Sequence, residues 1–317
     1  FQVLYSRELA VGDAIPVEYF GQELVVFRTE AGEAKVVDAF CPHMGAHLGY
    51  GIREQTGKGP RIVGDSIECP FHGWRWNGEG QCTHIPYAKN MPPRVAKGES
   101  ILGAWDVREV NQQILVWYHP KKEAPTWEPE VIPEAAANHP DWGEMIIHTW
   151  DINAHMQEMG ENAVDAAHFH YVHGTDDVPE AAFQNFDGHI REGKFITRQP
   201  TPRGVVDGAI ETRSQGAGLS VVRFTGIYDT LLLANVTPVG PEKTYASYAF
   251  IQPRATQETL GKTVGQAIIG NICQQMAEDQ IISARNQYFE RPLLCDGDGP
   301  FAKFRRWFSQ FLVEPTA

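Results

Sequence analysis

The sequence has no excess of basic residues, no long apolar run and no regular pattern of cysteines. Its 317 residues include 40 acidic and 27 basic side chains, a net charge of −13, which argues against a nucleic-acid or anionic-membrane partner. No apolar run approaches the roughly 20 residues of a membrane-spanning helix, and the first residues lack the pattern of a signal peptide. The five cysteines form no disulfide framework, so we expect a reducing, cytoplasmic location.

Residues 1–119 predict a small all-β domain, because short β-rich runs alternate with turns that hold Gly, Pro, Asp or Asn. Segment 120–140 contains five prolines and predicts an extended linker, so a second domain is expected over 120–317. The strands predicted in the first domain are Leu24–Phe27, Lys35–Phe40, Arg61–Val63, Ser66–Glu68 and Gln113–Tyr118.

Two cysteine–histidine pairs lie in turns of this first domain. Cys41 and His43 form a C-x-H pair, and Cys69 and His72 form a C-x-x-H pair. Two thiolates and two imidazoles could bind zinc or a Rieske [2Fe–2S] cluster, in which two Cys hold one iron and two His the other. Strands and bulky aromatic residues flank the second pair where a zinc finger would have a helix, which favours the cluster. His47 lies outside both short loops and is interpreted as structural.

The second domain predicts an antiparallel sheet followed by a long helix. The strand candidates are Ile146–Ile152, Ile210–Tyr228, Leu231–Val236 and Tyr245–Gln252, and Thr263–Arg291 predicts the helix. Several apolar side chains of these strands could line a substrate pocket, although packing in the core explains each of them better: Phe224, Leu231, Leu232, Leu233 and Phe250.

The run Glu161–His173 carries residues typical of a mononuclear iron site. Two His plus one carboxylate is the ligand set of non-haem Fe(II) oxygenases. His168 and His173 are five residues apart, about 140° on a regular helix. They can share a metal only if a widened turn or a helix end lies between them, and Gly174 suits a helix end. His170 competes with His168 as a ligand.

The third ligand is expected in the late helix, which contains the pair Glu278 and Asp279. At about 100° per residue, Asp279 shares a face with Ile272 and Met276, whereas Glu278 falls on the polar face with Gln274. A carboxylate on an apolar face must be paired or bind a metal, because burying it bare is very costly. Asp279 is therefore the predicted ligand, the alternative being that both acids are a solvated surface pair.

Taken together, these motifs resemble the oxygenase component of Rieske non-haem iron ring-hydroxylating oxygenases. The family pattern is C-x-H and C-x-x-H, followed by D-x-x-H-x-x-x-x-H. Asp165, His168 and His173 match the last motif at every fixed position, and the resemblance selects His168 over His170. The sequence is most similar to the 3-ketosteroid 9α-hydroxylase group, in residues 41–45, 69–76, 85–88, 164–169, 292–300 and 304–311.

Two stretches depart from that likeness. The gap between His43 and Cys69 holds 25 residues, and its Gly/Lys/Pro-rich piece around 55–60 is interpreted as a surface insertion. Residues 198–254 match only loosely, and because this region should line the pocket, the substrate is left open.

The resemblance implies an α+β protein with an all-β Rieske domain and a helix-grip catalytic domain built on an antiparallel sheet. It implies that Asp165 is not a ligand but bridges an iron histidine to a cluster histidine of a neighbouring subunit in a homotrimer, with Asn162 supporting the same network. The implied cluster ligands are Cys41, His43, Cys69 and His72, and the implied Fe(II) ligands are His168, His173 and Asp279.

The function implied is O₂-dependent hydroxylation of a hydrophobic, steroid-like polycyclic compound. No G-x-G-x-x-G motif follows a predicted strand, so the electrons would come from a separate NAD(P)H-dependent reductase of the flavin or ferredoxin type. A sterol desaturase, or a demethylase or hydroxylase of an aromatic compound, would carry the same motifs. Two other classes stay open from the sequence: a Rieske electron-transfer protein with an inert second domain, and a zinc-stabilised binding protein.

Overall fold

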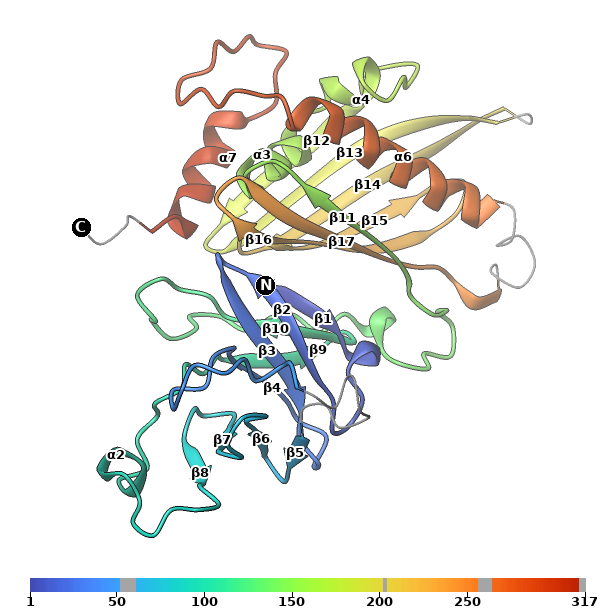
Figure 1. The fold of residues 1–317 in the computed structure, drawn as a ribbon. Coiled ribbons are helices and arrows are strands. Elements are labelled where there is room, and N and C mark those ends of the chain that lie inside the picture. The colour runs from blue at the N-terminus through green and yellow to red at the C-terminus, as the bar shows by residue number, and fades with distance from the viewer. Residues whose placement is uncertain (52–60, 202–203, 256–263, 314–317) are drawn as a thin grey trace. The chain divides into compact units, whose positions relative to one another are not determined.

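The computed structural model describes residues 1–51, 61–201, 204–255 and 264–313, and the chain divides into two compact units, 1–131 and 132–317 (Figure 1). The domain boundary expected at 119/120 stays a prediction, and the insertion expected around 55–60 lies outside the described residues. None of the helices in the described part of the chain combines the length and apolar character needed to cross a bilayer.

The first unit consists of three small antiparallel sheets. Its core packs Val25, Phe27 and Trp76 together with the thiols of Cys41 and Cys69, so the predicted cluster loops begin at buried positions. The sheets are β1 (Gln2–Tyr5), β10 (Gln113–Val116) and β9 (Val107–Val110); β2 (Ala14–Tyr19), β3 (Gln22–Arg28) and β4 (Ala34–Asp38); and β5 (Arg61–Val63), β6 (Ser66–Glu68), β7 (Arg75–Asn77) and β8 (Cys82–His84). Short helices are η1 (Ser6–Glu8) and α2 (Pro93–Ala96).

The second unit is built on one seven-stranded antiparallel sheet. The predicted strand Ile146–Ile152 is confirmed as β11. The stretch predicted over 210–228 is two strands, because the chain turns at Gly216 with a positive φ of 63°. In sheet order the strands are β11 (Ile146–Ile152), β17 (Lys243–Ile251), β16 (Thr230–Gly240), β15 (Leu219–Thr225), β14 (Gly204–Gln215), β13 (Ile190–Thr201) and β12 (Glu180–Asp187).

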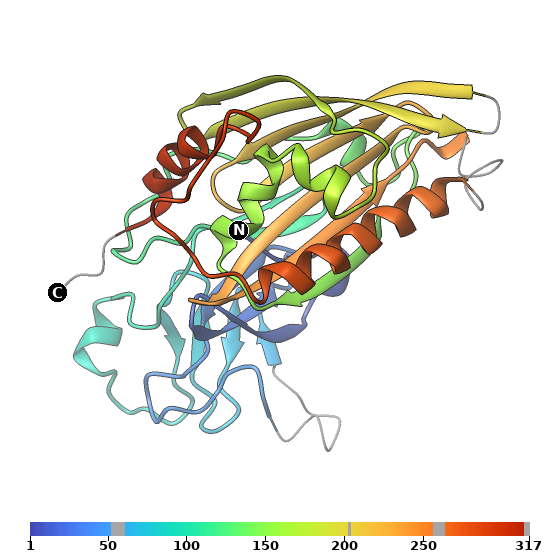
Figure 2. The same cartoon turned by 90° about the horizontal axis from the view of Figure 1, so that it is seen from above.

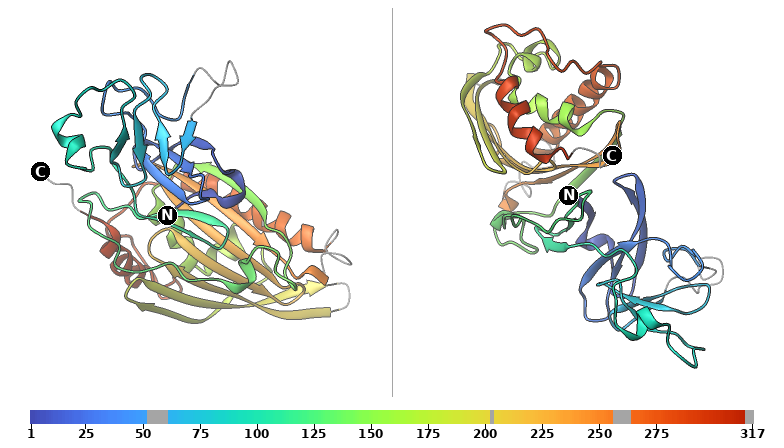
Figure 3. Two further views of the ribbon diagram at one scale, coloured as in Figure 1. Left: turned by 90° about the horizontal axis from the view of Figure 1, so that it is seen from below. Right: turned by 90° about the vertical axis from the view of Figure 1, so that its left-hand side faces the viewer.

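The helices of this unit gather on one face of the sheet, which curves around them (Figures 2 and 3). On α6, Ile269 packs against Leu232 and Phe250, and Met276 packs against Ile152. This is the predicted α+β architecture with a sheet wrapped on a helix. The helical elements are η2 (Pro133–Ala135), α3 (Met156–Glu161), η3 (Asn162–Val164), α4 (Ala167–Tyr171), α6 (Gln266–Ser283), α7 (Phe301–Phe308) and η5 (Ser309–Phe311).

The predicted extent of the late helix was wrong at its C-terminal end. α6 ends at Ser283, whereas the pattern predicted helix to Arg291. Beyond it, the guanidinium of Arg305 donates to the carbonyls of Phe289 (2.6 Å) and Glu290 (3.4 Å). The loop after α6 is therefore held by a side chain of α7. Helical periodicity in the sequence could not reveal this contact.

Candidate metal centres

The two cysteine loops of the first unit have the same backbone geometry. The amide of Cys41 donates to the carbonyl of Ala46 (2.9 Å), and that of Cys69 donates to the carbonyl of Trp74 (2.7 Å). In each loop the glycine four residues after the cysteine donates back to the cysteine carbonyl and has a φ above +70°. Glycine adopts that left-handed conformation at little cost, so the two loops form matching tight turns.

The side chains of these loops converge as a cluster ligand set. Cys41 and Cys69 are 1% and 3% exposed, and their thiols are hydrogen-bonded to each other, which lowers the pKa of Cys69 to about 6 and raises the pKa of Cys41. The rings of His43 and His72 have centroids 4.8 Å apart. The Nδ1 atom of each ring is buried without a hydrogen-bond partner among the described residues, as expected for nitrogens reserved for a metal.

The spacing of these four ligands does not suit a single zinc ion. Ligand atoms about 2.1–2.3 Å from one tetrahedral ion lie within about 4 Å of one another. Among the described residues, these four do not form a group whose ligand atoms all lie within 4.8 Å of one another. The group that does lies in the second unit. Two thiols and two imidazoles spread over a longer distance fit a cluster with two irons.

Aromatic side chains enclose the cysteine loops. Trp76 donates its Nε1–H to the Sγ of Cys41 at 3.3 Å. The ring of Trp74 stacks on His43 with centroids 4.3 Å apart and donates to the hydroxyl of Tyr87. His47 accepts a hydrogen bond from the amide of its own loop at Gly49, so it serves the loop backbone, as predicted.

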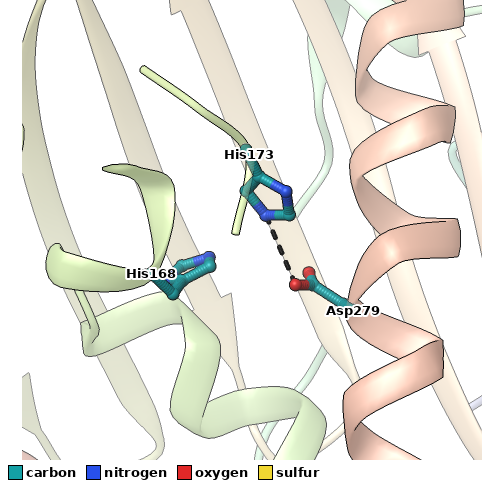
Figure 4. A group of neighbouring side chains, drawn as sticks. All are labelled: His168, His173 and Asp279. Carbon is teal, nitrogen blue, oxygen red and sulfur yellow. Dashed lines mark ion pairs between the residues drawn. The ribbon is translucent and has the colours of Figure 1, made fainter. Parts of the chain in front are cut away.

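In the second unit, His168, His173 and Asp279 meet between α4 and α6. Their ligand atoms all lie within 4.8 Å of one another, and His173 Nε2 is 3.3 Å from Asp279 Oδ1 (Figure 4). The three side chains are 13%, 2% and 14% exposed respectively. Two imidazoles and one carboxylate suit a divalent iron that keeps open coordination positions.

A helix end brings the two histidines together despite their unfavourable spacing. α4 ends at Tyr171. The amide of His173 then donates to the carbonyl of His168 at 3.4 Å, five residues back, and Gly174 follows with a φ of 68°. This wide turn confirms the predicted local geometry. His170 turns away, with its Nδ1 2.5 Å from the carbonyl oxygen of Thr175.

The second nitrogen of each histidine is held by an oxygen. His168 Nδ1 is 2.9 Å from the carbonyl oxygen of Asp165, and His173 Nδ1 is 2.9 Å from Glu278 Oε2. Donation from Nδ1 fixes the tautomer whose Nε2 lone pair is available to a metal. The sequence reasoning missed Glu278, which it placed on the polar face. Neighbouring residues on a helix are only about 100° apart, so two adjacent acids can contact the two nitrogens of one imidazole. The Glu278–Asp279 pair in the sequence was the available signal for this arrangement.

Burial shapes the charge state of this site. It raises the pKa of Asp279, against the opposing effect of the two histidines and of a hydrogen bond from Asn162. Burial likewise lowers the pKa of His168. This lowered pKa favours the neutral imidazole of His168, the form that binds metals.

Asp165 lies within hydrogen-bonding distance of its own chain. Its Oδ1 accepts from the amides of Ala167 (2.9 Å) and His168 (3.3 Å), at the start of α4. Its Oδ2 is 3.8 Å from His168 Nδ1, too far for a direct hydrogen bond. Within its own unit, Asp165 thus positions the backbone that carries His168.

The candidate iron triad of His168, His173 and Asp279 opens onto a cavity of about 200 Å³ between the sheet and the helices. The walls are mostly apolar, which suits a hydrophobic ligand. Of the five pocket candidates, Phe224 and Leu232 line this cavity, and the described lining does not include the other three. Its further apolar lining includes Ile210, Val222, Tyr248, Ile272 and Met276.

Comparison with known proteins matches both units to family models. Residues 1–100 match the Rieske [2Fe-2S] domain, and residues 116–312 match the 3-ketosteroid 9alpha-hydroxylase C-terminal domain. The chain is 32% identical to a 3-ketosteroid-9-alpha-monooxygenase oxygenase component of Rhodococcus rhodochrous, over 98% of this chain and 81% of that protein. It is 31% identical to cholesterol 7-desaturase nvd of Xenopus laevis, over 98% of this chain and 70% of that protein.

Solved structures share the fold at lower identity. Dicamba monooxygenase superposes with a TM-score of 0.76 at 17% identity, covering 98% of this chain and 96% of that one. NdmB of Pseudomonas putida CBB5 superposes with a TM-score of 0.72 at 19% identity, covering 97% and 88%. These comparisons confirm the predicted family, the fold class and the two cofactors, a [2Fe–2S] cluster and Fe(II).

Proposed function

The chain belongs to the family of Rieske-type monooxygenases that includes the 3-ketosteroid 9α-monooxygenase oxygenase components, and from that membership we propose that it hydroxylates a steroid-like polycyclic substrate. The observation that carries the proposal is the triad of His168, His173 and Asp279 opening onto an apolar cavity. When bound, the cluster and the Fe(II) supply electrons and activated O₂ for insertion of one oxygen atom into a C–H bond.

The proposed ligands follow the geometry of the two sites. Their neighbours orient them: Asp165 and Glu278 hold the Nδ1 sides of the histidines, and Asn162 holds the carboxylate of Asp279. The apolar wall excludes water from the reacting carbon and orients the substrate by shape. Cys41, His43, Cys69 and His72 would hold the cluster, and His168, His173 and Asp279 would hold the iron.

The electron path is proposed to need a second copy of the chain. Asp165 would bridge His168 to a cluster histidine of a neighbouring subunit in a homotrimer, because a carboxylate between two imidazoles orients both. The reductase is proposed to be a separate NAD(P)H-dependent protein of the flavin or ferredoxin type, since the sequence has no dinucleotide-binding glycine motif. The free thiols of all five cysteines favour the cytoplasm as the compartment.

A sterol desaturase is the second candidate, because cholesterol 7-desaturases resemble the chain almost as closely as the hydroxylase components do. Both reactions use O₂ and an iron centre, and they differ in whether the product gains oxygen or loses two hydrogens. The motifs are common to both, so only the product can decide between them.

The test is a turnover assay on iron-loaded protein with a ferredoxin-type reductase and NADH. 3-Ketosteroids, sterols and small aromatic acids would be offered, with products identified by mass. A steroid product heavier by one oxygen atom supports the proposal, and one lighter by two hydrogens supports the desaturase. A product from aromatic acids alone overturns the steroid assignment. If no compound is converted and a His168→Ala variant transfers electrons as fast as the parent protein, the chain would instead fit a mere electron carrier.

A further inference from the structure

The cavity beside His168, His173 and Asp279 contains a buried cation that has no acidic partner among the described residues. Arg191, on β13, is only 1% exposed and lines the cavity. Its guanidinium donates to three neutral acceptors: Ser214 Oγ (3.3 Å), Gln184 Oε1 (3.2 Å) and the carbonyl of Ala163. A buried charge is normally paired with an opposite charge or bound to a ligand, because burial of an unpaired ion is strongly unfavourable.

Two other arginines of the same unit are paired with acids. Arg213 lies 2.5 Å from Glu192, and Arg223 lies 2.7 Å from Glu134, although both arginines are about 40% exposed. The most deeply buried of these guanidiniums is thus the one without a carboxylate. The acid in the described cavity lining is Asp279, which faces the histidines of the iron triad.

Two hydrogen-bond donors at this place are also unused. Arg191 Nε and Gln184 Nε2 are buried and have no partner within the described part of the chain. Both residues project from neighbouring strands, β13 and β12, and they touch each other. Burial lowers the pKa of Arg191 to about 10, which is still well above neutral pH, so the side chain stays positively charged.

Polar groups of the cavity wall cluster around this arginine. Ser220 donates to Ser214 at 2.9 Å, which in turn accepts from Arg191. These three side chains all line the cavity and follow one another across β13, β14 and β15. The cavity therefore combines an apolar wall with one cationic polar corner, the arrangement that orients an amphipathic ligand.

We propose that Arg191 binds a carboxylate carried by the substrate, so that the natural substrate class is an acidic polycyclic compound rather than a neutral one. This inference rests on the proposed function, because it assigns a substrate class to the same site. A carboxylate in the cavity would supply the missing negative charge and accept charge-assisted hydrogen bonds from the guanidinium of Arg191. Arg191 is then a specificity-determining residue that also sets which carbon faces the iron triad.

The first test needs no variant. Dissociation constants would be measured by equilibrium dialysis without O₂, for a 3-oxo steroid that ends in a carboxylic acid and for its primary carboxamide, a neutral analogue of similar size. We expect the acid to bind about 10- to 100-fold more tightly, the range for a hydrogen bond to a charged group. Equal affinities, or tighter binding of the amide, would overturn the inference.

The second test uses substitutions at Arg191 and a matched control. Arg191→Gln should abolish the preference for the acid, Arg191→Lys should keep part of it, and Arg223→Gln, which changes the same net charge outside the cavity lining, should keep all of it. Bound iron and thermal midpoint would verify that each variant folds, and a raised KM for the acid with little change for the amide would separate binding from structural damage. A full acid preference in Arg191→Gln refutes the assignment.

The proposed function and this inference can fail separately. The same acid and amide comparison would be made with a bicyclic aromatic acid. If the aromatic acid binds more tightly than its amide and neither steroid binds, the steroid assignment is wrong and the role of Arg191 stands. If both steroids bind equally well, the steroid assignment stands and the role of Arg191 is wrong. If neither steroids nor aromatic compounds bind, both proposals are overturned.

Discussion

Removing the carboxylate of Glu278 is expected to weaken Fe(II) binding although no predicted ligand is lost. Glu278 Oε2 is 2.9 Å from His173 Nδ1, and this contact lowers the pKa of Glu278. The ring it holds is 2% exposed, whereas the Glu278 side chain is 32% exposed. Without it, His173 can adopt the tautomer that places the proton on Nε2, which cannot bind a metal.

The size of the effect follows from the nature of the contact. Loss of a partner that orients a metal-bound histidine typically costs about 10- to 100-fold in metal affinity, and we expect this range for Glu278→Ala. Glu278→Gln should lose less, because its amide oxygen can still accept from Nδ1. Gln274→Ala removes only the hydrogen bond to Glu278 Oε1 at 2.8 Å and should have a smaller effect still.

Affinity would be measured by competition between the anaerobic protein and a chromogenic Fe(II) chelator, with the cluster absorbance as an internal control. Glu290→Ala, at an exposed acid in the loop after α6, is the matched control and should bind Fe(II) like the parent. An Fe(II) affinity that rises from Glu278→Ala to Glu278→Gln to the parent protein is expected for an orienting carboxylate. Parental Fe(II) affinity in Glu278→Ala would refute the reasoning.

Three further predictions follow from contacts in the two units. Asp165→Ala should keep both metal centres yet block electron transfer from cluster to iron, and a normal yield in a single turnover of pre-reduced protein would contradict this. Trp76→Phe removes the N–H that Cys41 Sγ accepts at 3.3 Å, so the reduction potential of the cluster should fall, and an unchanged value in protein-film voltammetry would count against that contact. Glu109→Gln should lower the free energy of unfolding by about 1 kcal/mol at neutral pH, because Arg28 lowers the pKa of Glu109. This difference from the parent protein should be fully present above about pH 4.3 and should vanish as pH falls through the lowered pKa of the folded state. Urea unfolding at two pH values measures it.

Each of these predictions has a matched control. Asp165→Asn keeps an oxygen for the amides of α4 and so separates loss of charge from loss of the helix cap. Trp105→Phe removes an indole hydrogen bond in the same unit, to Asp38 at 3.0 Å, and should leave the potential unchanged. Glu128→Gln breaks the exposed pair with Arg108 and should cost little stability, because solvent screens such pairs.

The local sequence was sufficient where chemistry depends on neighbours in the chain. The two cysteine loops could be recognised because each places a thiol, an imidazole and a turn-forming glycine within five residues. The wide turn between His168 and His173 followed from their spacing and from Gly174. The strand Ile146–Ile152 followed from its β-branched and aromatic residues, because such side chains suit a pleated surface.

The helix end and the partner of His173 could not be predicted in this way. α6 stops at Ser283, and the loop that follows it is held by Arg305, which lies more than a dozen residues further along the chain. Glu278 reaches His173 across 105 residues. Helical periodicity takes account only of neighbours on the same helix, so the sequence predicted that Glu278 faces solvent.

The sequence by itself determined the ligand types, their order and the family, because motifs of metal-binding residues are short and their spacing is set by turn geometry. Only the tertiary structure decided which groups line the cavity. In the sequence, Arg191 is an ordinary basic residue of a strand. The packing of β12, β13 and η3 around it removes water and leaves its charge without an acidic partner among the described residues. Burial and charge balance depend on contacts between distant segments, which is why the proposed carboxylate site could be inferred from the fold and not from the motifs.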